Sequence, residues 1–213
     1  MLNARHIRGE SCVHMSEQNG VRSLHLGNSM VQSAMRLAVP NQLELTYTRC
    51  MMGFLLFHPN PANILMIGLG GGSLAKFVYH RLHRTQTIVI EVNPEVVVTA
   101  RNYFFVPPDD ERLQVLIAEG SEYIANHPAS TDVLMVDGFD DGCQVASLCT
   151  QDFYNHARAV LKRRKRFGPQ VAGDCLGSVT SSSTRGGQKS SNADTNSSTV
   201  APVCFATRTG SLT

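Results

Sequence analysis

The sequence predicts an α/β protein built on a doubly wound, Rossmann-like sheet, incomplete at its C-terminal side and preceded by a short β element. An apolar run at 64–67 opens into glycines at 68 and at 70–72. From residue 61 to 162, short apolar runs alternate with segments of helical spacing, as βαβ units do. Acidic residues follow the apolar runs at three places. We expect residues 61–162 to form a nucleoside-binding domain.

The N-terminal part predicts a small appendage to this domain. Residues 1–20 are polar and lack the apolar core of a signal peptide, so we expect disorder there. Residues 21–39 alternate weakly around the turn signal Gly27-Asn28, which indicates a short hairpin or small β element. Apolar residues recur at helical spacing from Gln42 to Phe57 and predict one buried helix. Together these segments make an N-terminal unit at 21–60.

The glycine-rich stretch predicts a ligand at the first strand-to-helix turn. A helix from Ser73 would point its free N–H groups and positive dipole end at that ligand. The pattern Gly68-x-Gly70-x-x-Ser73 lacks the third glycine or alanine of the dinucleotide fingerprint, so close helix packing is an alternative explanation. Glu91 ends the next predicted strand, at the place where an acid binds ribose hydroxyls. Nicotinamide dinucleotide and S-adenosylmethionine both fit this unit.

The alternation continues beyond Glu91. Asn93-Pro94 supplies an N-cap and a first-turn proline for a helix over 96–103. Further strands are predicted at 112–118 and 132–137, with a short helix at 121–126 between them and a helix near 153–161 after them. The apolar run of the 132–137 strand indicates burial on both faces.

Ligands of open α/β sheets bind beyond the carboxyl ends of the strands, so the acids there should share one crevice with the glycines. Glu91, Glu119 and Asp137 close three predicted strands and imply a ligand with cationic or hydroxyl-rich parts. Asp140 and Asp141 follow in a loop more acidic than a turn requires, although Asp and Gly are also ordinary turn formers.

Five motifs in this order and spacing resemble the polyamine aminopropyltransferases, the spermidine and spermine synthases, from about residue 30 to 161. The motifs are Gly68-Leu69-Gly70-Gly71-Gly72, Glu91-Val92-Asn93-Pro94, Ala118-Glu119-Gly120, Val136-Asp137-Gly138-Phe139-Asp140 and Asp152-Phe153-Tyr154. The resemblance implies a class I methyltransferase fold. It also implies aminopropyl transfer from decarboxylated S-adenosylmethionine to an amine of a polyamine, with no metal.

The same resemblance implies a role for each site residue. It assigns Gly68, Gly70, Gly72, Glu91, Glu119, Gly120 and Gln32 to the cofactor, and Asp140 and Tyr47 to the polyamine. Asp137 would be the catalytic base, since an alkylammonium with a pKa of about 10 must lose a proton before its nitrogen attacks carbon.

The chain departs from the family pattern in two of these motifs. Gly71 stands where the family carries the aspartate that holds the aminopropyl ammonium, and Asn28-Ser29 replaces its Asp-Gly. The loss of an acid at Gly71 makes a methyltransferase using intact S-adenosylmethionine one alternative, and the missing distal strands make a non-catalytic truncated remnant another. A nicotinamide enzyme is the least favoured, because Glu119 and Asp137 have no role in it.

The C-terminal sequence breaks the pattern. A doubly wound sheet would continue with a fifth apolar strand, but 163–166 is basic and half of the residues from 177 to 200 are Ser or Thr. We expect residues 163–213 to be a low-complexity, disordered tail. A shifted reading frame or truncated gene, or a natural disordered extension, would explain it.

Composition limits the partners. A net charge of +2 does not favour nucleic acid, and the basic cluster at 163–166 is typical of a solvated charge run. Six cysteines without C-x-x-C spacing indicate reduced thiols, no metal site and a cytoplasmic location. The longest apolar run, 50–57, is too short to span a membrane. We expect a small-molecule amine as partner, and a homodimer stays open.

Overall fold

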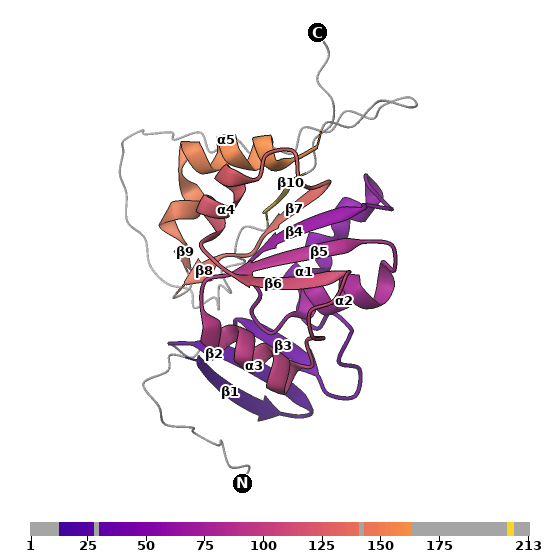
Figure 1. The fold of residues 1–213 in the computed structure, drawn as a ribbon. Helices are drawn as coiled ribbons and strands as arrows, with labels where there is room; N and C mark the ends of the chain where they lie inside the picture. The colour runs from indigo at the N-terminus through magenta and orange to yellow at the C-terminus, as the bar shows by residue number, and fades with distance from the viewer. Residues whose placement is uncertain (1–12, 28–29, 141–142, 163–203, 207–213) are drawn as a thin grey trace, which may run out of the picture.

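The computed structural model describes residues 13–27, 30–140, 143–162 and 204–206 of the 213-residue chain. These residues form a five-stranded sheet with helices on both faces and a separate three-stranded sheet (Figure 1). The predicted α/β fold with a doubly wound sheet is confirmed, as is the small N-terminal β element.

The main sheet has the strand order β10-β7-β4-β5-β6. Four of its strands are parallel, namely β4 (Asn63–Ile67), β5 (Gln86–Glu91), β6 (Leu113–Ile117) and β7 (Val133–Val136). The fifth, β10 (Cys204–Ala206), pairs antiparallel with β7. Because β4 lies between β5 and β7, the chain changes direction across the sheet at β4, where a doubly wound fold binds its ligand.

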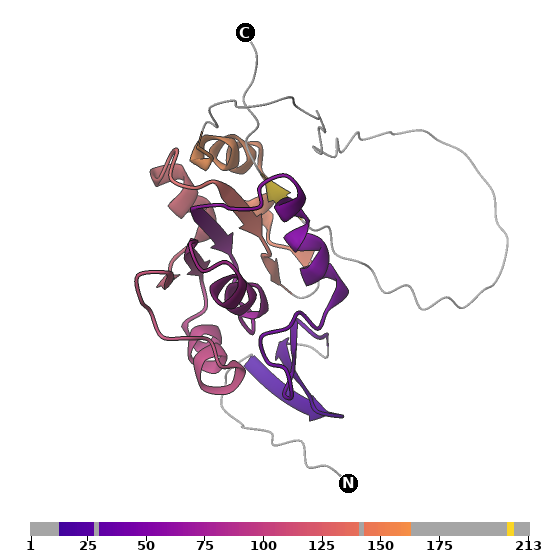
Figure 2. The same cartoon turned by 90° about the vertical axis from the view of Figure 1, so that its right-hand side faces the viewer.

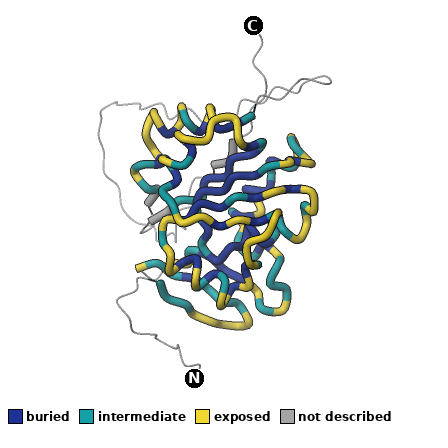
Figure 3. The backbone as a smooth tube through the Cα atoms, in the orientation of Figure 1, coloured by how far each residue is buried: buried dark blue, intermediate teal, exposed yellow. Residues whose placement is uncertain are grey.

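Helices cover both faces of this sheet, as the two views in Figures 1 and 2 show. One face packs on α2 (Ser73–Arg81) and α3 (Pro94–Phe104) and the other on α4 (Gly120–Asn126) and α5 (Gln151–Val160). Two separate apolar clusters result, one on each side of the sheet. The buried strands form the continuous dark core of the tube in Figure 3.

Strand β4 shows why the parallel strands are apolar on both faces. Ile64 and Met66 belong to the cluster beneath α2 and α3, whereas Leu65 and Ile67 belong to the cluster beneath α4 and α5. All four residues of β7 are buried, as the apolar run predicted. The N-cap predicted at Asn93 is also confirmed, because its side chain accepts a hydrogen bond from the Glu95 N–H at 2.9 Å.

The small sheet begins earlier than the sequence predicted. It consists of β1 (Val13–Gln18), β2 (Val21–Leu26) and β3 (Ser33–Arg36), paired antiparallel in that order. The expectation of disorder over residues 1–20 is therefore wrong for β1, while residues 1–12 lie outside the described part. The strand was missed because its second half is exposed and polar, so it lacks apolar alternation.

The prediction of a single helix from Gln42 to Phe57 is also wrong. A short α1 (Thr46–Met51) passes directly into a 3₁₀ helix, η1 (Met52–Leu56). Neither has a side-chain N-cap, and Gly53 lies within the second, so regular α-helix is poorly supported beyond Met51.

The sequence shows no fifth apolar strand after residue 162, but in the structure a short strand lies beside β7. Cys204, Phe205 and Ala206 pair with Val136, Met135 and Leu134, so β10 takes the place next to β7. These three residues form a strand within the tail that the sequence predicted to be disordered, and residues 163–203 and 207–213 lie outside the described part. No helix in the described ranges is long and apolar enough to span a bilayer.

Candidate active site

The carboxyl ends of β4 and β7 meet at Gly68 and Asp137. The Asp137 N–H donates to the Ile67 carbonyl at 2.8 Å, and the Gly68 N–H donates to the Ile90 carbonyl at 2.8 Å. Gly68 has φ +94°, and a Cβ there would lie 2.3 Å from the Asp137 carbonyl oxygen. Only glycine fits this position, which brings the glycine loop directly against the predicted catalytic residue.

The rest of the loop also depends on its glycines. Gly70 and Gly72 have φ of +52° and +68°, and a Cβ on Gly72 would lie 2.2 Å from Val106 Cγ2. Gly72 is the N-cap of α2, so the loop ends at the positive end of that helix. The positive end of α2 thus lies at the loop, while the N–H groups of Gly68, Leu69 and Gly72 donate to the Ile90 carbonyl, to Glu91 Oε2 and to the Leu69 carbonyl.

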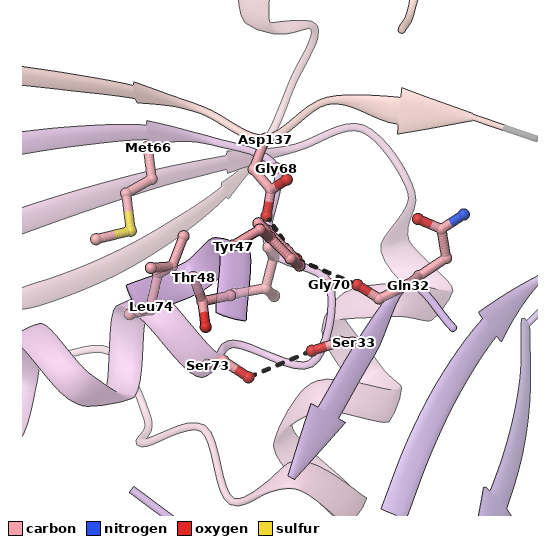
Figure 4. Close-up of a pocket in the computed structure, with 12 residues that line it drawn as sticks. Gln32, Ser33, Tyr47, Thr48, Met66, Gly68, Gly70, Ser73, Leu74 and Asp137 are labelled. Carbon is pink, nitrogen blue, oxygen red and sulfur yellow. Dashed lines mark hydrogen bonds between the residues drawn. The ribbon is translucent and has the colours of Figure 1, made fainter. Parts of the chain in front are cut away.

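A small pocket lies beside this loop, between β3, α1 and Asp137 (Figure 4). Its cavity is about 20 Å³, which is space for about one water-sized group. Among the described residues that line it, Asp137 alone carries a carboxylate. The lining brings together five of the predicted site residues, which are Gln32, Tyr47, Gly68, Gly70 and Asp137.

Asp137 and Tyr47 form the polar centre of the pocket. The Tyr47 hydroxyl donates to Asp137 Oδ2 at 3.2 Å and also lies 3.4 Å from the Gln32 carbonyl oxygen. Burial raises the pKa of Asp137 to about 6, the charge of Glu91 adds to this, and the Tyr47 hydrogen bond opposes it. Burial and the Asp137 charge raise the pKa of Tyr47, so its hydroxyl keeps its proton. A partly buried carboxylate that ionises near neutral pH is suited to proton transfer.

Glu91 is buried at the end of β5, and two backbone groups fix its carboxylate. Oε2 accepts from the Leu69 N–H and Oε1 accepts from the Asn93 N–H, both at 2.9 Å. Each carboxylate oxygen has a second lone pair and can accept another hydrogen bond. Glu91 thus links the glycine loop to the β5 end and remains able to accept hydrogen bonds from a diol.

The side chain of Glu119 caps α4. Its Oε2 accepts from the Ser121 hydroxyl at 2.5 Å and the Glu122 N–H at 2.8 Å, and its Oε1 accepts from the Ser147 hydroxyl at 3.0 Å. Partial burial opposes ionisation of Glu119, but these hydrogen bonds outweigh it and lower the pKa. A Cβ on Gly120 would lie 2.5 Å from Ile67 Cγ2, so this glycine permits close packing on β4.

Two predicted residues contribute less than expected to the described geometry. The Gln32 carbonyl faces Tyr47, whereas its side-chain amide extends away from that contact (Figure 4). Asp140 lies in the short strand β8 (Phe139–Asp140), which pairs with β9 (Cys143–Gln144), and its side chain is outside what the structure describes. Their ligand roles stay predictions.

The structure adds residues that the sequence did not indicate. The Ser33 and Ser73 hydroxyls lie 3.3 Å apart across the pocket wall, and Ser73 also lies 3.4 Å from the Ala34 carbonyl oxygen. Val92, which follows β5, is 68% exposed, and Ile117, the last residue of β6, is 59% exposed. The sequence does contain a signal for Val92, because this apolar residue directly follows Glu91, the acid at the end of β5.

Gly71 is crowded on the side where a side chain would project. A Cβ there would lie 2.7 Å from Ser33 Oγ and 2.8 Å from Phe104 Cδ1. Among the described residues, no group of three or more His, Cys, Asp or Glu side chains is placed to hold a metal ion.

Comparison with known proteins gives a consistent result. The profile of the "Spermine/spermidine synthase domain" matches residues 44–170. A polyamine aminopropyltransferase of Chromobacterium violaceum is 40% identical over 155 residues, which cover 73% of this chain and 59% of that protein. The chain therefore spans less than two thirds of the length of this curated relative.

Two solved structures have a similar fold. A probable spermidine synthase from Corynebacterium glutamicum aligns with a TM-score of 0.62 and 19% identity, over 71% of this chain and 57% of that one. A spermidine synthase in complex with the transition-state analogue AdoDATO aligns with a TM-score of 0.53 and 26% identity, over 70% of this chain and 55% of that one.

Proposed function

Since the chain belongs to the spermine/spermidine synthase family, we propose that it transfers an aminopropyl group from decarboxylated S-adenosylmethionine to a primary amine of a polyamine. The observation that carries the proposal is Asp137, a partly buried carboxylate beside the glycine loop with a pKa raised to about 6. The Tyr47 hydroxyl donates to Asp137 and orients it.

The reaction follows from what this carboxylate can do. Above pH 6 Asp137 is largely ionised, so it can bind the substrate ammonium by a charge-assisted hydrogen bond and take one of its protons, which frees the nitrogen lone pair. The amine lone pair attacks the carbon bonded to the sulfonium, and the carbon–sulfur bond breaks with its electron pair going to sulfur. Methylthioadenosine leaves, and the product nitrogen remains as a secondary ammonium, since Asp137 has already taken one proton.

The nucleoside would lie along the ends of β5 and β6. Glu91 is fixed by two backbone N–H groups and keeps lone pairs for the two ribose hydroxyls. The exposed side chains of Val92 and Ile117 offer apolar surface for the adenine ring. The Glu119 carboxylate already accepts three hydrogen bonds. We therefore propose that it fixes the first turn of α4 and does not bind the adenine base directly.

Binding of methylthioadenosine tests the nucleoside site. Glu91→Gln should weaken binding by about 1–3 kcal/mol, because it removes charge-assisted hydrogen bonds to buried hydroxyls. The exposed Glu111 provides the matched control, and Glu111→Gln should bind as the wild type does. Isothermal titration calorimetry measures both. Equal affinity of Glu91→Gln and wild type would remove Glu91 from the site.

A second candidate is methyl transfer from intact S-adenosylmethionine, and the crowding at Gly71 favours it. The Ser33 hydroxyl and the Phe104 ring fill the space that a side chain at position 71 would need, so no acid can stand there to hold an aminopropyl ammonium. Competition between decarboxylated and intact S-adenosylmethionine for the wild-type site separates the two functions. Tighter binding of the decarboxylated form supports aminopropyl transfer, and tighter binding of the intact form supports methyl transfer.

A further inference from the structure

Lys76 is a fully buried ammonium that the proposed reaction does not use. It lies on α2, one turn beyond the glycine loop, and its exposure is 0%. Its Nζ donates to the Phe104 carbonyl at 2.6 Å, to the Pro40 carbonyl at 2.9 Å and to Met35 Sδ at 3.0 Å. Within the described ranges no carboxylate lies within 4.0 Å of it. Its charge is therefore held by neutral acceptors alone.

The acceptors come from segments that are far apart in sequence. Met35 lies in β3, Pro40 lies in the turn after it, and Phe104 is the last residue of α3. The Phe104 carbonyl is at a helix end, where carbonyl groups lack partners within the helix. Desolvation makes a buried ammonium costly, so an apolar side chain of similar length would serve simple packing better.

The segments that Lys76 joins are those that bound the glycine loop. The Phe104 ring and the Ser33 hydroxyl close on Gly71, and Ser33 lies two residues before Met35 on β3. One turn earlier on α2, the Ser73 hydroxyl contacts Ser33. Ser73 and Lys76 thus fasten β3 to the start of α2, and Gln32 of the pocket directly precedes β3.

We propose that Lys76 is a positioning residue of this site, whose ammonium holds β3 and the end of α3 against the glycine loop. The proposal rests on the proposed function in one respect, that the loop binds the nucleoside co-substrate. Lys76 is not among the described residues that line the pocket beside the loop. It sets the relative position of the small sheet and the main sheet, and with it the width of the pocket between Gln32 and Gly70.

The charge state of Lys76 should make ligand binding depend on pH. An ammonium has three N–H donors for the three acceptors, and a neutral amine has two. Burial lowers the pKa of Lys76 to about 8, so the hydrogen bonds that Lys76 donates to β3 and α3 should weaken as pH rises through that value.

The neighbouring charges do not share this titration. His80, on the next turn of α2, has a pKa lowered by burial and by Arg112 and Lys76, so it is neutral above pH 7. On β3, Arg36 pairs with Glu44, and on α3, Arg101 pairs with Asp109.

Methylthioadenosine binding by calorimetry tests the proposal in Lys76→Met, Lys76→Arg and the control Lys162→Met. Lys162 contacts Asn63 and Asp132 where strands β4 and β7 begin, at the end of the sheet opposite to the glycine loop. Lys76→Met should weaken binding by about tenfold or more, as loosened positioning does, while Lys162→Met stays near wild type. Lys76→Arg should restore most of the affinity. Between about pH 7 and pH 9, affinity should fall in the wild type and stay flat in Lys76→Arg, because arginine keeps its charge.

A folded Lys76→Met with wild-type affinity would overturn the proposal. If Lys76→Met does not fold, the pH comparison of wild type and Lys76→Arg decides, and a flat wild-type profile overturns it. A wild type that binds no methylthioadenosine at all refutes the proposed function instead. In that case hydrogen exchange decides, because Lys76→Met should speed exchange of the β3 and Gly70–Gly72 amides relative to Lys162→Met, and equal rates reject the positioning role.

Discussion

Replacing Gly71 with alanine should destabilise the protein, because its neighbours leave no room for a methyl group. The new Cβ would lie 2.7 Å from Ser33 Oγ and 2.8 Å from Phe104 Cδ1. The Ser33 hydroxyl can rotate away at the loss of its contact with Ser73, but Phe104 is 0% exposed and packs within the apolar cluster beneath α2 and α3. Overpacking of this kind costs about 1–3 kcal/mol.

An opposing effect reduces the net loss. The φ of Gly71 lies outside the left-handed region, so alanine restricts the unfolded chain at no backbone strain, which contributes about 0.4–1 kcal/mol of stability. The net destabilisation is therefore roughly 1–2 kcal/mol. Gly53→Ala is the matched control, since nothing lies within 4 Å of its added Cβ, and it should be neutral or slightly stabilising.

Urea unfolding followed by circular dichroism measures these changes, and a double-mutant cycle identifies their cause. Phe104→Leu removes ring atoms from the contact, so the double variant Gly71→Ala/Phe104→Leu should be more stable than the sum of the single changes predicts. Gly71→Ala as stable as Gly53→Ala, or strictly additive effects of the two changes, would refute the steric argument.

Two further predictions concern Asp137 and the sheet edge. The pKa of Asp137 in the folded protein, about 6, exceeds its ordinary value of 3.8, so the folded state binds more protons between these pH values. The protein therefore loses about 3 kcal/mol of stability as pH rises through 6. In urea titrations from pH 4 to pH 8, Asp137→Asn should lack this loss, and parallel curves for the two proteins would contradict the raised pKa. Truncation after Lys162 removes β10 and exposes the β7 edge, so it should promote self-association in analytical ultracentrifugation, whereas a monodisperse truncated monomer would show that β10 does not protect the edge.

The βαβ core could be predicted because its signals are local. The apolar β4 run, the glycine loop and the Asn93-Pro94 cap each specify a structure within a few residues. Strand β1 has an exposed polar half, and β10 has three residues that form a strand only by pairing with β7. Both depend on contacts with distant segments, which periodicity does not report.

In the candidate site, too, some features follow from local sequence and others depend on contacts with distant segments. Strand ends predicted the convergence of Gly68 and Asp137, because parallel strands end at one edge of a sheet. The capping role of Glu119 and the burial of Lys76 were not predicted, since both follow from partners supplied by other elements. A charged residue within an apolar helix face, such as Lys76, is the signal that would have pointed to a buried contact.

Turnover tests the central claim most directly. The purified chain is incubated with decarboxylated S-adenosylmethionine and a polyamine, and release of methylthioadenosine is followed by liquid chromatography. Aminopropyl transfer predicts methylthioadenosine and an elongated polyamine in equal amounts, with turnover lowered by on the order of 10² to 10⁴ in Asp137→Asn, whose amide cannot accept the proton. No methylthioadenosine with any polyamine, from a folded protein, would contradict the account and indicate a non-catalytic remnant.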